Sequence, residues 1–179
     1  SEIFFYQSFR DGFFHGDLHP GNIFVNQSGK IIAIDFGIMG RLNLNDRKFL
    51  AKLFNFLLNK QFYEISKLHQ ENGMLDKDTD LYKLTQEIRI LAIPILNKPI
   101  GDISMGNLFG EILALSRKFN IKIQAKFCLL QKSMIMAEGI ARQINPKANI
   151  WQTTEPLMTQ WINDNMKYDF LFEKINDKK

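Results

Sequence analysis

The sequence predicts a mainly α-helical domain of the α+β class, in which one β-hairpin packs on about six or seven helices. Residues 22–35 contain two short runs of β-branched and apolar residues, separated by the turn residues "NQSG". From residue 43 onward, apolar residues recur at helical intervals in one segment after another. The chain has 179 residues, 45% of them hydrophobic, which is enough for one domain with a proper core.

The segment before the hairpin is expected to be helical and to end at Gly12. Its apolar and aromatic residues recur at roughly helical intervals: Ile3, Phe4, Tyr6, Phe9 and Phe13. After the hairpin, the same periodicity predicts helices within residues 43–60, 62–73, 79–96, 104–120, 123–146 and 153–165.

Several of these helices carry start or stop signals. Asn45 is a candidate N-cap, and Thr154 is another, with Pro156 near its first turn. Pro94 is expected to kink or end its helix, and Asn145 precedes a proline that closes the longest one. We therefore expect one domain over residues 1–168, followed by a charged tail, 169–179, that frays.

Composition excludes several classes of protein. Lysines and arginines are scattered among acids, and the net charge is +4, so no nucleic-acid-binding stripe is evident. Cys128 is the only cysteine, which excludes an internal disulfide, and its apolar helical setting predicts a buried thiol in a reducing compartment. We expect a cytoplasmic location and no transmembrane segment, because the most apolar windows fall well short of about 20 residues.

The predicted hairpin brings two candidate magnesium ligands together. If its turn is centred near Gln27 and Ser28, the first strand leads away from Asn22 and the second returns toward Asp35. Those two ends are neighbours in an antiparallel pair, and amide and carboxylate oxygens suit Mg²⁺. Asp17 precedes them on the loop that enters the hairpin. Its carboxylate there can accept a proton from a hydroxyl or position an attacking water.

Residues 15–22 and 35–37 match two motifs in the required order. The first reads H-x-D-x-x-x-x-N and the second D-F-G, which is the catalytic-loop and metal-loop pairing of protein kinases. Each motif alone is weak, but the pair around a hairpin is specific.

The histidines and Gly37 are assigned supporting roles. His15 is expected to orient the backbone rather than act as a base, and Gly37 belongs to the metal loop. His19 has two open roles, a contact with phosphate or stabilisation of the following Pro-Gly turn. His69 is expected at the surface. The three histidines are too dispersed for a zinc site.

Two blocks of the sequence resemble the UbiB family of atypical kinase-like proteins. The first is "GFFHGDLHPGNIFV…GKIIAIDFGIMGRL", and the second is "MIMAEGIARQINPKANIWQTTEPLMTQWI". The resemblance covers about residues 3–166. It assigns Asp17 to the catalytic aspartate and Asn22 and Asp35 to the metal ligands. Glu138 and Arg142 match its late block, and they equally suit a structural i, i+4 ion pair, which we favour.

This resemblance implies a protein-kinase-like C-lobe that uses ATP and Mg²⁺ and supports ubiquinone (coenzyme Q) biosynthesis. The family's K-x-G-Q segment and nucleotide-binding N-lobe are not in this sequence. Weak nucleotide binding is therefore expected until an N-lobe, from the same gene or a split gene, completes the site. Peripheral contact with the inner membrane or with ubiquinone-biosynthesis proteins is a further expectation.

Two other functions remain open at this point. One is a minimal small-molecule phosphotransferase of the aminoglycoside-phosphotransferase type, which would also carry "HGDLHPGN" and "IDFG". We do not expect such an enzyme to carry "EGIARQINP". The other is a non-catalytic helical binding module that retains the motif residues by descent.

Overall fold

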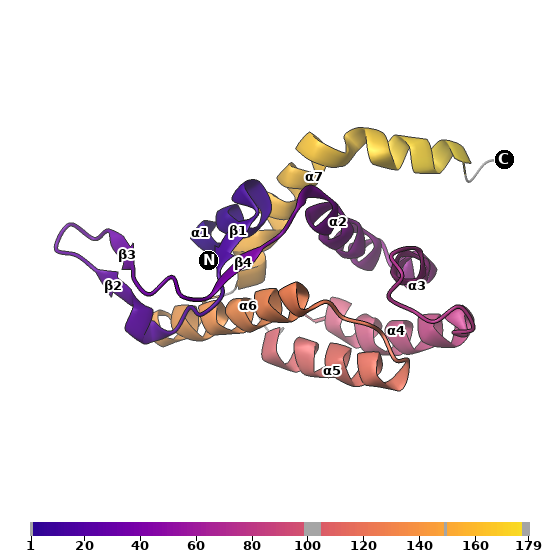
Figure 1. Ribbon diagram of the computed structural model, residues 1–179, viewed down its shortest axis with the longest axis horizontal. Helices are drawn as coiled ribbons and strands as arrows, with labels where there is room; N and C mark the ends of the chain where they lie inside the picture. The colour runs from indigo at the N-terminus through magenta and orange to yellow at the C-terminus, as the bar shows by residue number, and fades with distance from the viewer. Residues whose placement is uncertain (1, 99–104, 149, 177–179) are drawn as a thin grey trace.

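A computed structural model describes residues 2–98, 105–148 and 150–176, in which helices dominate (Figure 1). The described elements are α1 (Glu2–Phe5), the π-helical turn η1 (Tyr6–Asp11), β1 (Phe13–His15), the 3₁₀ turn η2 (Pro20–Asn22), β2 (Ile23–Val25), β3 (Ile31–Ala33), β4 (Met39–Arg41), α2 (Leu44–Leu58), α3 (Phe62–Glu71), α4 (Leu81–Leu96), α5 (Met105–Lys118), α6 (Ala125–Ile144) and α7 (Ile150–Asn176). One small antiparallel sheet, β2–β3, lies at one end of the molecule, and a second, β1–β4, lies between it and the helices (Figure 1). The predicted fold class, a mainly helical body with a β-hairpin, is confirmed.

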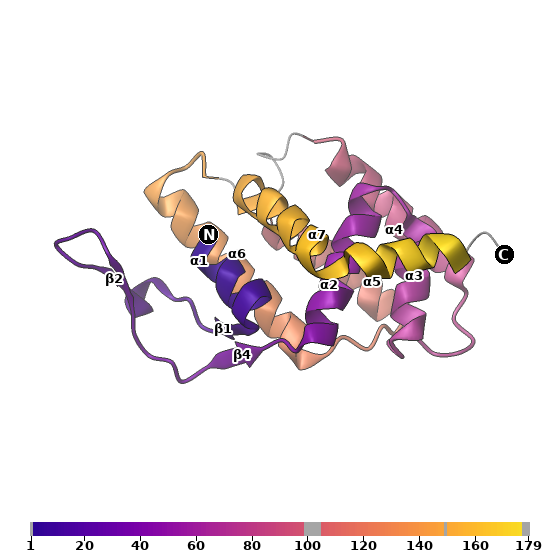
Figure 2. The same cartoon turned by 90° about the horizontal axis from the view of Figure 1, so that it is seen from above.

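The β2–β3 hairpin lies where it was predicted, with its turn near Gln27 and Ser28. Ile23 pairs with Ala33 and Val25 with Ile31, and the side chain of Asn26 accepts hydrogen bonds from the turn that joins the strands. The hairpin projects from the helical body, at the end of the molecule opposite the C-terminus (Figures 1 and 2).

A second strand pair, β1–β4, was not predicted. Gly12 ends the first helical segment as expected, with a φ of +69° that favours glycine. The left-handed turn sends the chain into β1, so Phe13, which lies at a helical interval in the sequence, begins a strand instead. Phe14 is completely buried as a result, and His15 enters the core beside it.

The main core lies between β1 and helices α2, α3, α4 and α6. Its buried residues are Phe4, Phe14, Leu42, Phe49, Phe56, Phe62, Ile65, Leu68, Met74, Leu75, Leu84, Ile88, Ala92, Phe127 and Leu130. A second cluster joins the N-terminal segment to α7, where Phe9 meets Trp161 edge to face at 5.9 Å between ring centroids. This packing fixes the segment that leads into β1.

Three predicted helix signals are corrected by the structure. The N-cap of α2 is Asn43 rather than Asn45, because the Asn43 side chain accepts from Asp46 N and Asp46 Oδ2 accepts from Asn43 N. Pro94 does not end α4, which continues to Leu96. Thr154 is no cap either, since it lies inside α7, which begins at Ile150.

Two predictions about burial are also wrong. Cys128 is exposed, because it points away from the side of α6 on which Phe127 and Leu130 are buried in the core. His69 is half-buried rather than fully at the surface. It packs edge to face on Phe49 at 5.6 Å and lines an apolar cavity of about 210 Å³.

The end of the chain differs in part from the expected frayed tail. Helix α7 continues to Asn176, and residues 177–179 lie outside the described residues.

Within the described part of the chain, no helix combines the length and the apolar character needed to cross a membrane.

Candidate active site at the β1–hairpin junction

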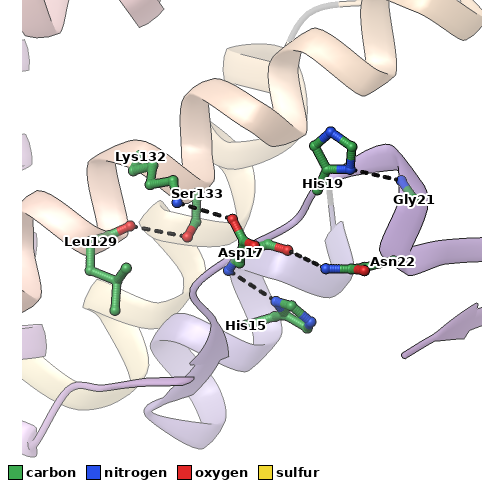
Figure 3. A network of polar contacts seen from close by, with 8 residues as sticks. All are labelled: His15, Asp17, His19, Gly21, Asn22, Leu129, Lys132 and Ser133. Carbon is green, nitrogen blue, oxygen red and sulfur yellow. Dashed lines mark hydrogen bonds and ion pairs between the residues drawn. The ribbon is translucent and has the colours of Figure 1, made fainter. Parts of the chain in front are cut away.

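His15 joins the catalytic loop to the end of the hairpin. It is buried at the end of β1, and its Nδ1 accepts a hydrogen bond from the Asp17 backbone N–H at 3.0 Å. Because Nδ1 accepts, the ring proton lies on Nε2, which is 3.3 Å from the Ile34 carbonyl oxygen and donates to it. Both ring nitrogens are therefore used to hold backbone, the contact expected of a backbone-orienting histidine. Figure 3 shows the bond from the Asp17 N–H.

Asp17 is held at three atoms. Its N–H is bonded to His15, and its carbonyl oxygen accepts from Asn22 Nδ2 at 3.3 Å. Its carboxylate Oδ1 lies 3.0 Å from Lys132 Nζ, which comes from α6 (Figure 3). The hydrogen bond from Lys132, helped by its positive charge, holds the pKa of Asp17 below the usual value of an aspartate. The carboxylate is thus ionised and remains partly open to solvent.

The hairpin brings Asn22 next to the metal loop. Ile34 donates its backbone N–H to the Asn22 carbonyl oxygen at 2.9 Å, so Asp35 directly follows the residue that pairs with Asn22. The Asn22 side-chain nitrogen donates to the Asp17 carbonyl oxygen. The amide oxygen is therefore the atom of this side chain that would bind a cation. This is the neighbourhood that the sequence predicted for the two candidate metal ligands.

Asp35 adopts an unusual backbone conformation. Its φ is +56°, in the left-handed region, where aspartate is one of the few side chains that are tolerated. Its Oδ1 accepts from the Gly37 backbone N–H at 3.2 Å, which closes a tight turn across the D-F-G residues. Phe36, between them, packs against the His15 ring at 5.4 Å between centroids.

The donor set suits a hard cation that brings other ligands with it. Asn22 and Asp35 supply one amide and one carboxylate oxygen, and Mg²⁺ is commonly held by one or two protein oxygens together with water and phosphate. The described residues contain no cluster of three or more His, Cys, Asp or Glu side chains able to hold a metal. The other ligands of a metal held by Asn22 and Asp35 would be water and phosphate oxygens.

The remaining predicted residues have identifiable contacts. His19 is exposed, and its Nδ1 accepts from the Gly21 N–H at 3.1 Å, so it caps η2 and makes the turn contact that was one of its two open roles. Glu138 and Arg142 form an ion pair within α6, with Arg142 Nη2 at 2.9 Å from Glu138 Oε1. Glu138 is buried, and the predicted i, i+4 pair is present.

Sequence reasoning missed Lys132. It lies 115 residues after Asp17, and its only local signal is that it is a cation in an otherwise largely apolar stretch of α6. Helical periodicity shows which residues share a face of α6, but it does not show which loop that face contacts.

The fold and this arrangement of loops define a protein-kinase-like C-lobe. The family model described as ABC1 atypical kinase-like domain matches residues 1–69, and the one described as UbiB helical domain matches residues 88–149. The chain belongs to the UbiB family of atypical kinase-like proteins.

Curated relatives agree with these family matches. The chain is 36% identical to "Probable protein kinase UbiB" of Glaesserella parasuis serovar 5, 38% identical to that of Shewanella baltica (strain OS155) and 36% identical to that of Sodalis glossinidius. Each match covers 99% of this chain and 33% of the relative, so the chain spans about a third of the length of the curated relatives it matches. No solved structure matches it significantly.

Proposed function

We propose that the chain supplies the catalytic and metal-binding half of a Mg-ATP-dependent kinase or ATPase. The observation that supports this most is the continuous set of hydrogen bonds that joins Asp17 to Asn22 and, through His15 and Ile34, to the loop of Asp35. These three residues carry the candidate chemistry, and the buried His15 between them links the two loops.

Each of the three residues has a separate task in this proposal. Asp17 accepts a proton from the attacking hydroxyl or orients an attacking water, which its ionised state permits. Asn22 and Asp35 bind Mg²⁺ through their side-chain oxygens, and the bound ion supplies charge neutralisation to the phosphates. His15 keeps the two loops in register, and Gly37 holds the Asp35 carboxylate through its N–H.

The proposed pathway is ubiquinone biosynthesis. The support for it is the UbiB name that the relatives carry, together with the match of the UbiB helical domain over residues 88–149. We place the chain on the cytoplasmic side of the inner membrane, in peripheral contact with that membrane or with proteins of the same pathway.

A partner lobe is also part of the proposal. Apolar side chains of the hairpin and the metal loop are exposed to solvent in this chain: Phe24, Val25, Ile31, Ile32, Ile34, Phe36 and Ile38. An apolar surface of this kind beside a candidate phosphate site is typical of an interface. We propose that a nucleotide-binding N-lobe, from the same gene or a second one, covers it and completes the ATP site.

The test is ATP turnover by the complete protein, with this chain and its N-lobe together. Asp35→Asn is expected to abolish Mg-dependent turnover, because it removes the negative charge of a proposed metal ligand while keeping the shape of the side chain. Asp78→Asn, an exposed aspartate on the loop before α4, is the matched control and should leave turnover unchanged. Wild-type turnover by Asp35→Asn would contradict the metal assignment.

Calorimetry on the chain alone tests the need for an N-lobe. Titration with Mg-ATP is expected to show weak binding or none, since half of the contacts are missing. Tight binding by the chain alone would contradict the incomplete site and favour a minimal phosphotransferase. Absence of binding even with the N-lobe present would favour a non-catalytic module.

A further inference from the structure

Helix α6 packs directly against the catalytic loop at Gly16. Gly16 donates its N–H to the Ile38 carbonyl at 2.8 Å, which places it between the metal loop and α6. A Cβ added to Gly16 would lie 2.8 Å from Ile38 Cγ2, closer than real Cβ contacts allow, and 3.0 Å from Leu129 Cδ1, tighter than nearly all of them. The loop can therefore approach α6 this closely only because residue 16 has no side chain.

The same face of α6 delivers Lys132 to Asp17. Residues three apart lie on one side of a helix, so Leu129 and Lys132 face the loop together. Leu129 packs beside Gly16, and Lys132 Nζ reaches Asp17 Oδ1 at 3.0 Å (Figure 3). The contact thus follows from helix geometry and a tightly packed loop rather than from one flexible side chain.

Helix α6 is itself anchored to the body of the domain. Near its N-terminus, Lys126 Nζ lies 2.6 Å from Asp46 Oδ1, and Asp46 is buried at the start of α2. Phe127 and Leu130 are buried in the main core on the next turn. Lys132 is therefore presented from a fixed helix, although its own side chain is half exposed, at 53%.

Lys132 completes the set of contacts that fix Asp17. His15 and Asn22 hold the backbone of Asp17, but neither holds its carboxylate. Among the groups that lower the pKa of this carboxylate, Lys132 has the largest effect, and His19 and His15 have smaller ones. Without Lys132 the carboxylate can rotate away from the position in which it meets an acceptor hydroxyl.

We propose that Lys132 is a positioning residue that fixes the catalytic carboxylate of Asp17 and thereby makes the helical domain part of the active site. This inference rests on the proposed function, and it names a residue in one matched domain, 88–149, that acts on a residue in the other, 1–69. Displacement of α6 by a partner or a ligand would then alter turnover through this one contact.

The experiment measures ATP turnover by the complete protein with Lys132→Met and Lys132→Arg. Misplacement of a general base typically costs on the order of 10- to 100-fold in rate. We expect Lys132→Met to lower kcat at least about tenfold, with KM for ATP changed less than about twofold. Lys132→Arg should recover most of kcat, because a guanidinium can make the same hydrogen bond.

Lys126→Met is the matched control on the same helix, since it also breaks a lysine–aspartate pair. It should lower the thermal unfolding temperature and leave kcat nearly unchanged, because Phe127 and Leu130 still hold α6 in the main core.

Two results would overturn the inference. One is a kcat of Lys132→Met within twofold of wild type, and the other is a loss in Lys126→Met that matches the loss in Lys132→Met, which would make the role merely structural. Asp35→Asn separates the two levels of argument. If Asp35→Asn abolishes turnover and Lys132→Met does not affect it, only the role of Lys132 is wrong; if Asp35→Asn remains active, the proposed function itself fails.

Discussion

Gly40 lies directly opposite Phe14 across the β1–β4 pair, and a Cβ on Gly40 would overlap the Phe14 ring. Phe14 is completely buried and meets Phe4 edge to face at 5.9 Å between ring centroids. His15 follows Phe14 directly, so the strand that delivers His15 to the catalytic loop depends on a glycine in its neighbour. This contact links a backbone requirement in β4 to the geometry of the candidate site.

Gly40→Ala is therefore expected to destabilise the domain by about 1–3 kcal/mol, the usual cost of overpacking a core. Urea unfolding followed by circular dichroism measures it. Gly139→Ala is the matched control, because its Cβ would meet nothing within 4 Å in α6. Alanine in a helix should stabilise by up to about 1 kcal/mol there. Equal stabilities for wild type and Gly40→Ala would show that the Phe14 ring can move aside.

The parts of this fold that the sequence predicted are those with local signals. The β2–β3 hairpin has a turn sequence between two apolar runs, and the helices have 3.6-residue periods. The β1–β4 pair lacks such a signal, since each strand has three residues and Phe13 also continues a helical pattern. Only the tertiary contact of Phe14 with Gly40 decides between the two.

The candidate site shows the same division. Asp17, Asn22 and Asp35 were identified because a known motif fixes their order, and the hairpin register made two of them neighbours. Lys132 was not identified, because its contact with Asp17 depends on how α6 packs across 115 residues of chain. His69 was predicted at the surface and Cys128 in the core for a related reason, since the types of the neighbouring residues do not show which side of a helix meets the core.

The capping box of α2 gives a second stability prediction. Asn43→Ala removes the side-chain oxygen that accepts from Asp46 N, and it should cost about 1 kcal/mol. Asn45→Ala is the control. It lies inside the helix and is exposed, so the change should stay within about 0.5 kcal/mol of wild type. A larger loss from Asn45→Ala than from Asn43→Ala would restore the cap position expected from the sequence.

His69 gives the domain a pH-dependent stability. Burial lowers the pKa of His69 below its usual 6.5, and its bond to the Ile65 carbonyl only partly opposes this. The folded state therefore binds this proton less readily than the unfolded state. Stability is complete above about pH 6.5 and falls below it, with a slope of at most about 1.4 kcal/mol per pH unit for one proton.

Urea unfolding between pH 5 and pH 8, in wild type and His69→Gln, measures this dependence. Glutamine does not titrate, so the fall between about pH 6.5 and pH 5 should disappear in the variant. The pKa values of Asp17 and Asp76 are lowered from 3.8, and those groups lose their contributions only at more acidic pH. An unchanged slope in His69→Gln would assign the dependence to other groups.

His15 provides the sharpest test of the scaffold beneath the candidate site. His15→Leu has a similar volume but removes both ring nitrogens, so the Asp17 N–H and the Ile34 carbonyl lose their side-chain partner. A typical hydrogen bond contributes a net of about 0.5–1.5 kcal/mol, so the loss of these two part-buried bonds should lower the unfolding free energy by about 1–3 kcal/mol. His19→Leu is the matched control in the same loop. His19 is exposed and loses only its one bond to the Gly21 N–H, so a smaller loss than in His15→Leu, up to about 1 kcal/mol, is expected.

His15→Asn separates the two hydrogen bonds of this side chain. An asparagine oxygen can take the place of Nδ1 and accept from the Asp17 N–H, but the side chain is too short to reach the Ile34 carbonyl as well. We expect its stability to lie between those of wild type and His15→Leu, and its ATP turnover in the complete protein to exceed that of His15→Leu. If His15→Asn and His15→Leu lose turnover equally while differing in stability, then the bond to Ile34, which holds the metal loop, controls the site rather than the bond to Asp17.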